Sequence, residues 1–262
     1  MSPAASSAYP PQVIDRILSW LHELDVRRAG RVVAIPGGAV LLHDDFPDAY
    51  DHNKLSVTAD HDVADAFESI VSQAGRDYRS IELRTTAWSR LEPTLIARGY
   101  LRQDNLLMVR AASSRRPRPP GQVVELTLDQ RATAAEEGWR TSAPTFTPDV
   151  CRQLGQRIST VCSAADATFL AILDEAGTPV ARADLYVYDS LAQIEEVVTD
   201  ESYRGRGFAT LLVDEAIKRA GAAPTFLIAD ADDWPKDLYA RLGFGGTQTL
   251  PTYSRQACTK ER

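Results

Sequence analysis

The stretch IEEVVTDESYRGRGFATLLVDEAIKRAG, residues 194–221, decides the fold of this chain. Its beginning predicts a buried strand, and its end has the apolar spacing of an amphipathic helix. The turn RGRGFA between them contains two glycines, and Gly205 and Gly207 permit a positive φ and close approach of a ligand to the backbone. The helix that begins near Gly207 adds unpaired N–H groups and the positive end of its dipole. With Arg204 and Arg206 beside it, the turn predicts a phosphate or pyrophosphate site.

Two familiar phosphate-binding motifs do not describe this turn. A Walker loop requires GxxxxGK[ST], which the chain lacks. The dinucleotide fingerprint requires a third glycine where this sequence has Thr210. The pattern that remains is [Q/R]xxGx[G/A], which Arg204, Gly207 and Ala209 satisfy.

With the segment TFLIADADDWPKDLYARLGF behind it, this turn resembles the pyrophosphate loop of the GNAT superfamily of acyl-CoA-dependent N-acyltransferases. The resemblance covers Ile194–Phe244. It implies an α/β fold with a mixed sheet flanked by helices, acetyl-CoA as cosubstrate and no metal. In the family, the strand before the loop splays from its neighbour and leaves backbone groups free for the pantetheine arm. The cofactor-binding residues that it implies are Val197, Val198, Thr199, Arg204, Gly205, Arg206, Gly207, Phe208, Ala209, Thr210, Asp232 and Tyr239.

Three residues are candidates for catalysis. Tyr239 matches the tyrosine that protonates the leaving thiolate in many relatives, and a helix tyrosine packed under the cofactor is the alternative. Glu195 and Glu196 are the candidate bases in an otherwise apolar strand, and a chain of water molecules is the alternative base. Adjacent strand residues point to opposite faces, so we expect only one glutamate to face the pocket. Thr199 has the same parity as Glu195, but a bulge would break that count, so the choice between the two glutamates stays open. A backbone N–H of the splayed strand is the candidate oxyanion donor.

One departure from the family pattern lies in ADADDWPKDLY. Relatives often carry an asparagine at the start of this helix, and here Asp232 or Asp233 takes its place. An aspartate is a good N-cap and Pro235 fits a first helical turn. The sequence therefore predicts a capping role for one of these aspartates.

The two halves of the chain are similar. KLSVTAD (54–60) resembles EEVVTDE (195–201), and each half ends in a helix stopped by a glycine, at Gly99 and Gly243, and then a strand. We predict two tandem GNAT-like domains, namely a degenerate one without the pyrophosphate loop at 1–110 and an acetyl-CoA-binding one at 122–262. The Pro- and Arg-rich segment 111–121 reads as a linker.

Bulk properties limit the function classes. The 262 residues carry a formal net charge of −7, which argues against nucleic-acid binding. We expect no membrane span, a cytoplasmic location and a monomer or homodimer. The three cysteines form no CxxC pair and predict free thiols.

Two further features have structural interpretations. HDDFPDAYDHN (43–53) contains histidines and aspartates that could suggest a metal, but we expect a solvated loop. Trp139 either lines a substrate pocket or belongs to the core.

The sequence predicts an N-acetyltransferase that transfers an acetyl group from acetyl-CoA to a primary amine, chiefly of a small molecule and secondly of a peptide or protein. The alternative from another class is a catalytically inactive GNAT-like protein that binds acyl-CoA or interacts with a partner. A third interpretation is amide synthesis on an amino-sugar thiol precursor.

Overall fold

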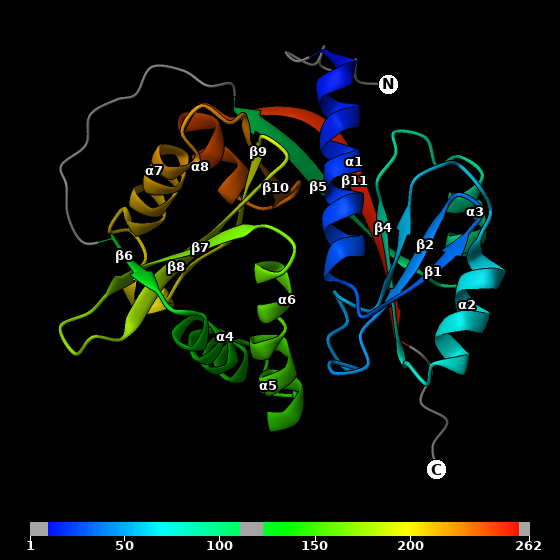
Figure 1. Cartoon of the computed structure of the whole chain (residues 1–262), viewed down its shortest axis with the longest axis horizontal. Coiled ribbons are helices and arrows are strands. Elements are labelled where there is room, and N and C mark those ends of the chain that lie inside the picture. Colours follow the sequence, from blue (N-terminus) through cyan, green and yellow to red (C-terminus); the bar gives the residue numbers. More distant parts are fainter. Residues whose placement is uncertain (1–9, 111–122, 257–262) are drawn as a thin grey trace.

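The structure is a computed structural model that describes residues 10–110 and 123–256. Its strands form one 11-stranded mixed sheet in the order β1-β2-β3-β4-β11-β5-β10-β9-β8-β7-β6. Helices cover both faces of this sheet (Figure 1). The predicted α/β class, a mixed sheet flanked by helices, is confirmed. The predicted linker at 111–121 lies outside the described residues.

The first half begins with the long helix α1, which crosses the middle of the molecule (Figure 1). Its elements are α1 (Pro11–Arg28), β1 (Arg31–Ile35), β2 (Gly38–Leu42), β3 (Lys54–Val57), α2 (Ala64–Gln73), β4 (Tyr78–Leu83), α3 (Leu91–Ala97) and β5 (Leu101–Arg110).

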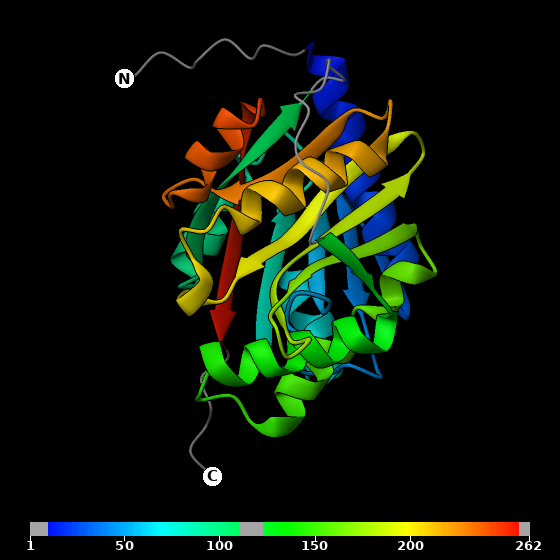
Figure 2. The same cartoon turned by 90° about the vertical axis from the view of Figure 1, so that its left-hand side faces the viewer.

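The second half carries an extra group of short helices, α4 to α6, at one end (Figure 2). Its elements are β6 (Val123–Leu126), α4 (Leu128–Ser142), α5 (Pro148–Gln156), α6 (Ser159–Cys162), β7 (Asp166–Leu173), β8 (Pro179–Tyr188), β9 (Leu191–Thr199), η1 (Glu201–Tyr203), α7 (Phe208–Ala220), β10 (Thr225–Asp230), α8 (Pro235–Arg241) and β11 (Gly245–Gln256).

The strand-helix-strand-helix-strand unit that the repeat predicts is present in both halves. It is β3-α2-β4-α3-β5 in the first and β9-α7-β10-α8-β11 in the second. The glycine stops are also in place, since Gly99 and Gly243 have φ values of 76° and 91°. The exact domain boundaries remain a prediction.

The final strands of the two halves are exchanged. β5, which ends the first half, pairs antiparallel with β10 of the second, and β11, which ends the second half, pairs antiparallel with β4 of the first. β5 and β11 also pair with each other along most of their length. The two halves therefore share one continuous sheet, and their junction is built from β4, β11, β5 and β10.

Helix α1 belongs to the first half by sequence but packs on strands of the second. Ile17, Trp20 and Leu21 are buried in one core cluster with Tyr186 of β8 and Phe226 of β10. The Trp20 indole also donates a hydrogen bond of 2.7 Å to the carbonyl oxygen of Tyr188. α1 thus covers one face of the sheet at the junction.

Helix α7 covers the opposite face. Along β8, Leu185 belongs to the cluster that contains the α7 residues Leu212 and Ala216, whereas the next residue, Tyr186, faces α1. This alternation follows from the two-residue period of a strand. Within the described residues, no helix is both long and apolar enough to cross a membrane.

The segment 43–53 is a loop as predicted, and Asp44, Asp45 and Asp48 are exposed, but its histidines and Asn53 are not solvated. His43, His52 and Asn53 are each less than 9% exposed. The Asn53 side chain accepts from the backbone N–H of His43 and donates to the carbonyl oxygens of Phe46 and Ala49. These internal bonds let the polar segment fold back on itself, and they bring His52 and Asp51 to the junction.

Candidate active site

The glycine-rich turn between β9 and α7 has an open backbone. Gly205 and Gly207 have φ values of 77° and 79°, and a Cβ at either position would meet no atom within 4 Å. The glycines are therefore required for their left-handed conformation and not by a packed neighbour. Gly207 is the N-cap of α7. Within the described part of the chain, no acceptor is recorded for the N–H groups from Gly205 to Thr210, so this run of donors is free to bind a ligand.

Strands β9 and β10 separate next to this turn. They pair in parallel only at their beginnings, where Thr225 faces Ala192 and Phe226 faces Gln193. From Ile194 onward, β9 keeps only its other neighbour, β8. The splayed strand that the family resemblance implies is therefore present, and its free backbone edge faces β10.

A cavity of about 610 Å³ lies at the splay and the turn, and we call it the loop cavity. Ten of the twelve predicted cofactor-binding residues line it. The other two lie elsewhere: the guanidinium of Arg206 stacks on the Tyr203 ring, and the backbone N–H of Asp232 donates to the carboxylate of Asp230. The ten are Val197, Val198, Thr199, Arg204, Gly205, Gly207, Phe208, Ala209, Thr210 and Tyr239.

The predicted capping aspartate is wrong. The N-cap of α8 is Trp234, and no side chain caps the helix. The Asp233 carboxylate accepts from the adjacent Trp234 N–H at 2.7 Å, and Asp233 lines the loop cavity. Because Pro235 occupies the first helical position, the N-cap position falls on Trp234, one residue after Asp233 and two after Asp232.

A β-bulge in β9 changes the direction of one of the two candidate bases. Glu196 has a φ of 53°, and the register between β8 and β9 shifts between Arg182 and Asp184. A positive φ is rare for a glutamate, and bulges often reorient side chains near active sites. The expectation that only one glutamate faces the pocket is therefore wrong, because Glu195 and Glu196 line the same cavity.

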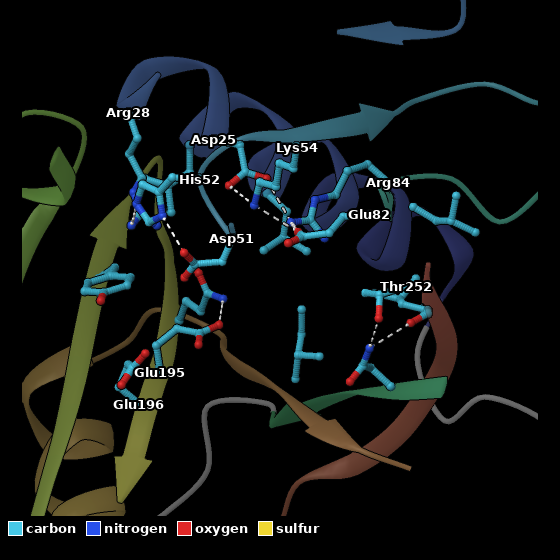
Figure 3. Close-up of a pocket in the computed structure, with 18 of the residues that line it drawn as sticks. Asp25, Arg28, Asp51, His52, Lys54, Glu82, Arg84, Glu195, Glu196 and Thr252 are labelled. Carbon is cyan, nitrogen blue, oxygen red and sulfur yellow. Dashed lines mark hydrogen bonds and ion pairs between the residues drawn. The ribbon is translucent and has the colours of Figure 1, made fainter. Parts of the chain in front are cut away.

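That second cavity, of about 340 Å³, lies at the junction of the two halves, and we call it the junction cavity (Figure 3). Both halves contribute to its wall, and most of its lining is polar. The charged residues in its wall are Asp25 and Arg28 of α1, Asp51 and Lys54 near β3, Glu82 and Arg84 around β4, Arg157 after α5, and Glu195 and Glu196 of β9.

Glu195 has the environment of a base that works near neutral pH. Burial, and secondly the charge of Glu196, raises the pKa of Glu195 to about 8. The only hydrogen bond recorded for its carboxylate within the described residues comes from the Gln193 amide. A carboxylate with a pKa this close to neutral can take a proton from an ammonium group.

Tyr239 is the candidate acid. It lines the loop cavity, and burial and the Glu195 carboxylate raise its pKa to about 12. The phenol therefore stays protonated at neutral pH and can donate to a nearby anion.

An ion-pair network holds Glu196 in place. Its carboxylate lies 3.5 Å from Arg157 and 3.4 Å from Arg131, and Arg131 also forms a two-pronged pair with the buried Asp184 at 2.7 and 2.8 Å. Glu196 is therefore neutralised by two guanidinium groups, whereas Glu195 has no cation within 4 Å among the described residues. This contrast makes Glu195 the better candidate for the base.

Sequence reasoning missed most of the junction cavity. Arg28, Asp51 and Arg157 carry no motif, and they meet only because α1 and the segment before β3 pack beside β9. No local pattern could have found them. Trp139 does not line either cavity, and it stacks on Phe146 and contacts Tyr50 edge-on.

Comparison with known proteins indicates the class of protein to which this fold and site belong. Residues 134–244 match the model of the acetyltransferase (GNAT) family. The structure is similar to a GCN5-related N-acetyltransferase from Kribbella flavida (TM-score 0.63, 22% identity, 92% of this chain and 95% of that chain). It is also similar to a functionally unknown conserved protein from Staphylococcus epidermidis (TM-score 0.67, 16% identity, 87% and 94%). A tandem GNAT protein from the clavulanic acid biosynthesis pathway is similar at a TM-score of 0.53 and 14% identity, with 97% and 98% covered. No curated protein matches the chain.

Residues 134–244 form a GNAT acetyltransferase domain, and the protein is an acyltransferase. The family transfers acyl groups from acetyl-CoA. Among the described residues, no group of histidine, cysteine and acidic side chains is arranged to hold a metal ion.

Proposed function

We propose that the protein transfers the acetyl group of acetyl-CoA to the primary amine of a small molecule. The observation that carries the proposal is the splay between β9 and β10, which has the loop cavity at one side and the junction cavity with Glu195 at the other. A donor and an acceptor could thus reach the same point from opposite sides.

The residues of the loop cavity fit acetyl-CoA. The free N–H groups from Gly205 to Thr210 suit a pyrophosphate, and the free edge of β9 suits a pantetheine amide. The buried hydroxyl oxygen of Thr199 has no hydrogen-bond partner among the described residues, so it is available to a ligand. In this proposal the cofactor-binding domain is 122–262, and the domain at 1–110 supplies part of the acceptor wall.

The chemistry needs two proton transfers. The amine nitrogen forms a bond to the acetyl carbonyl carbon, and the carbon–sulfur bond breaks. Glu195 takes the proton that the amine loses, and Tyr239 donates from its hydroxyl to the leaving sulfur. The backbone N–H of Val197 or Val198, beside the bulge, is the proposed donor to the oxyanion.

Thiol release from acetyl-CoA with a panel of small primary amines tests the proposal. We expect release with at least one amine, and a kcat about 100 times lower or more for Tyr239→Phe, since a positioned acid typically contributes a factor of about 100 to 10,000. Tyr203→Phe is a matched control, because Tyr203 also lines the loop cavity but has no proposed proton-transfer role. Acetyl-CoA binding without release for any amine would favour the inactive, acyl-CoA-binding alternative. A cytoplasmic location and a monomeric or homodimeric state remain predictions.

A further inference from the structure

The charged residues of the junction cavity are almost all paired with each other. Lys54 lies 2.9 Å from Asp25 and 3.0 Å from Glu82. Arg84 contacts the same two carboxylates. These four groups form a closed cluster on the wall that belongs to the first half, away from Glu195 and Glu196 (Figure 3).

A second paired group lies near β9. Arg157 binds Asp51 at 2.6 Å and approaches Glu196 at 3.5 Å. Together with Arg131, it neutralises Glu196. Each charged residue in this group therefore has an oppositely charged partner within the protein.

Two charged residues of the cavity lack an oppositely charged partner. Within the described residues, no carboxylate lies within 4.0 Å of Arg28, and no cation lies within 4.0 Å of Glu195. The recorded side-chain partners of Arg28 are neutral, namely the imidazole of His52 at 2.6 Å and the hydroxyl of Thr160 at 3.3 Å. A guanidinium at the wall of a cavity with only neutral partners is available to an anionic group.

His52 stays neutral beside Arg28. Burial, and secondly the Arg28 charge, lowers the pKa of His52 to about 3. Its Nε2 therefore accepts from Arg28, and its Nδ1–H donates to Asp51 at 3.2 Å. This bond holds Arg28 in place without neutralising it.

Arg28 and Glu195 face the same cavity. Both line the junction cavity, and the charge of Arg28 is among the groups that act on the Glu195 carboxylate. The same cavity wall therefore holds the proposed base and a cation without an oppositely charged partner. Its volume of about 340 Å³ is at the small end of the range for ligand sites.

We infer that the acceptor is a small zwitterion of the amino-acid type, whose amine lies at Glu195 and whose carboxylate lies at Arg28. This inference rests on the proposed function and narrows its substrate class. The ligand would give Arg28 and Glu195 the oppositely charged partners that they lack within the protein. A peptide or protein lysine has no carboxylate near its amine and would leave Arg28 without an anion.

The test measures thiol release with free amino acids and with their methyl esters, which keep the amine and lack the carboxylate charge. For at least one amino acid we expect kcat/KM to be about 10 to 100 times higher than for its ester, the range that a charge-assisted hydrogen bond gives. In Arg28→Ala this ratio should fall to about one. Arg27→Ala is the matched control, because it removes the same charge from the same helix but Arg27 lies against Tyr188, outside the cavity.

The outcomes separate the two proposals. If amines without a carboxylate, or the esters, are acetylated as well as the acids, the zwitterion inference is overturned and the proposed function stands. The same holds if the preference for the acid survives in a folded Arg28→Ala protein. If no amine in either panel releases thiol, the proposed function fails, and the inference fails with it. The comparison of acid with ester in the wild type needs no variant, so a poorly folded Arg28→Ala protein does not weaken the test.

Discussion

The two halves contain the same unit but differ where the parallel strands end. In the first half, β3 and β4 stay paired to the last residue, Val57 beside Leu83, and the Arg84 N–H continues the ladder by donating to the Val57 carbonyl oxygen. In the second half, β9 leaves β10 after two residue pairs. The bulge at Glu196 is the local difference, since it inserts one residue and bends the strand.

The loops that follow these strands also differ. In the second half the turn has two glycines and free N–H groups. In the first half, the Asp60 carboxylate accepts from the Arg90 N–H and the Ser89 hydroxyl, and the Asp62 carboxylate accepts from the Thr94 hydroxyl. The first loop is therefore tied to α3 by its own negative charges, which would repel a phosphate. A closed strand pair and an acidic loop together support the prediction that the first half has no cofactor site.

The largest expected effect comes from removing the base at the splay. Glu195→Gln should lower kcat by about 100- to 10,000-fold, the range for a general base. In the wild type, kcat/KM should rise as the pH increases through about 8, because Glu195 must lose its proton to act. A rate profile across that pH range checks this, and an unchanged profile in Glu195→Gln would contradict the role.

The same substitution should change the pH dependence of stability. Between its ordinary pKa of 4.5 and about 8, Glu195 holds a proton in the folded protein that the unfolded chain releases. Its contribution to stability therefore falls as the pH rises through this range. Thermal unfolding at pH 6 and pH 9 should show a smaller loss for Glu195→Gln than for the wild type.

The next effect concerns the glycine loop. Gly207→Val should weaken acetyl-CoA binding by about 100-fold, since a β-branched residue at this positive φ distorts a turn that supplies several charge-assisted hydrogen bonds. Gly75→Val is the matched control, because Gly75 has a φ of 66°, also meets open space, and lies in the half without the loop. Titration calorimetry measures both. Equal affinities in the wild type and a folded Gly207→Val protein would remove the cofactor assignment.

The smallest expected effect comes from a substitution in the loop of the first half. Asp60→Ala should lower the unfolding temperature slightly, because it frees the Arg90 N–H, and should leave the affinity for acetyl-CoA unchanged. Calorimetry should give one acetyl-CoA per chain for the wild type and for this variant. A stoichiometry of two would show that the first half also binds the cofactor.

Local patterns in the sequence predicted much of the proposed cofactor-binding site. The loop, α7 starting at Phe208 and the helix-stopping glycines depend on residues close together in the chain, because φ preferences and apolar periodicity are local properties. The alternation rule failed at Glu195 and Glu196 for a physical reason. A bulge depends on how β9 pairs with β8, and the two adjacent glutamates alone do not predict one.

The sequence by itself determined the superfamily, the duplicated unit and the half that carries the glycine loop. The tertiary structure decided that β5 and β11 are exchanged, that α1 packs on the second half, and that Arg28 faces the same cavity as Glu195. The physical reason is the separation along the chain. Backbone conformation follows from neighbours in the sequence, whereas the junction cavity is lined by side chains about 170 residues apart, which only the packed sheet brings together.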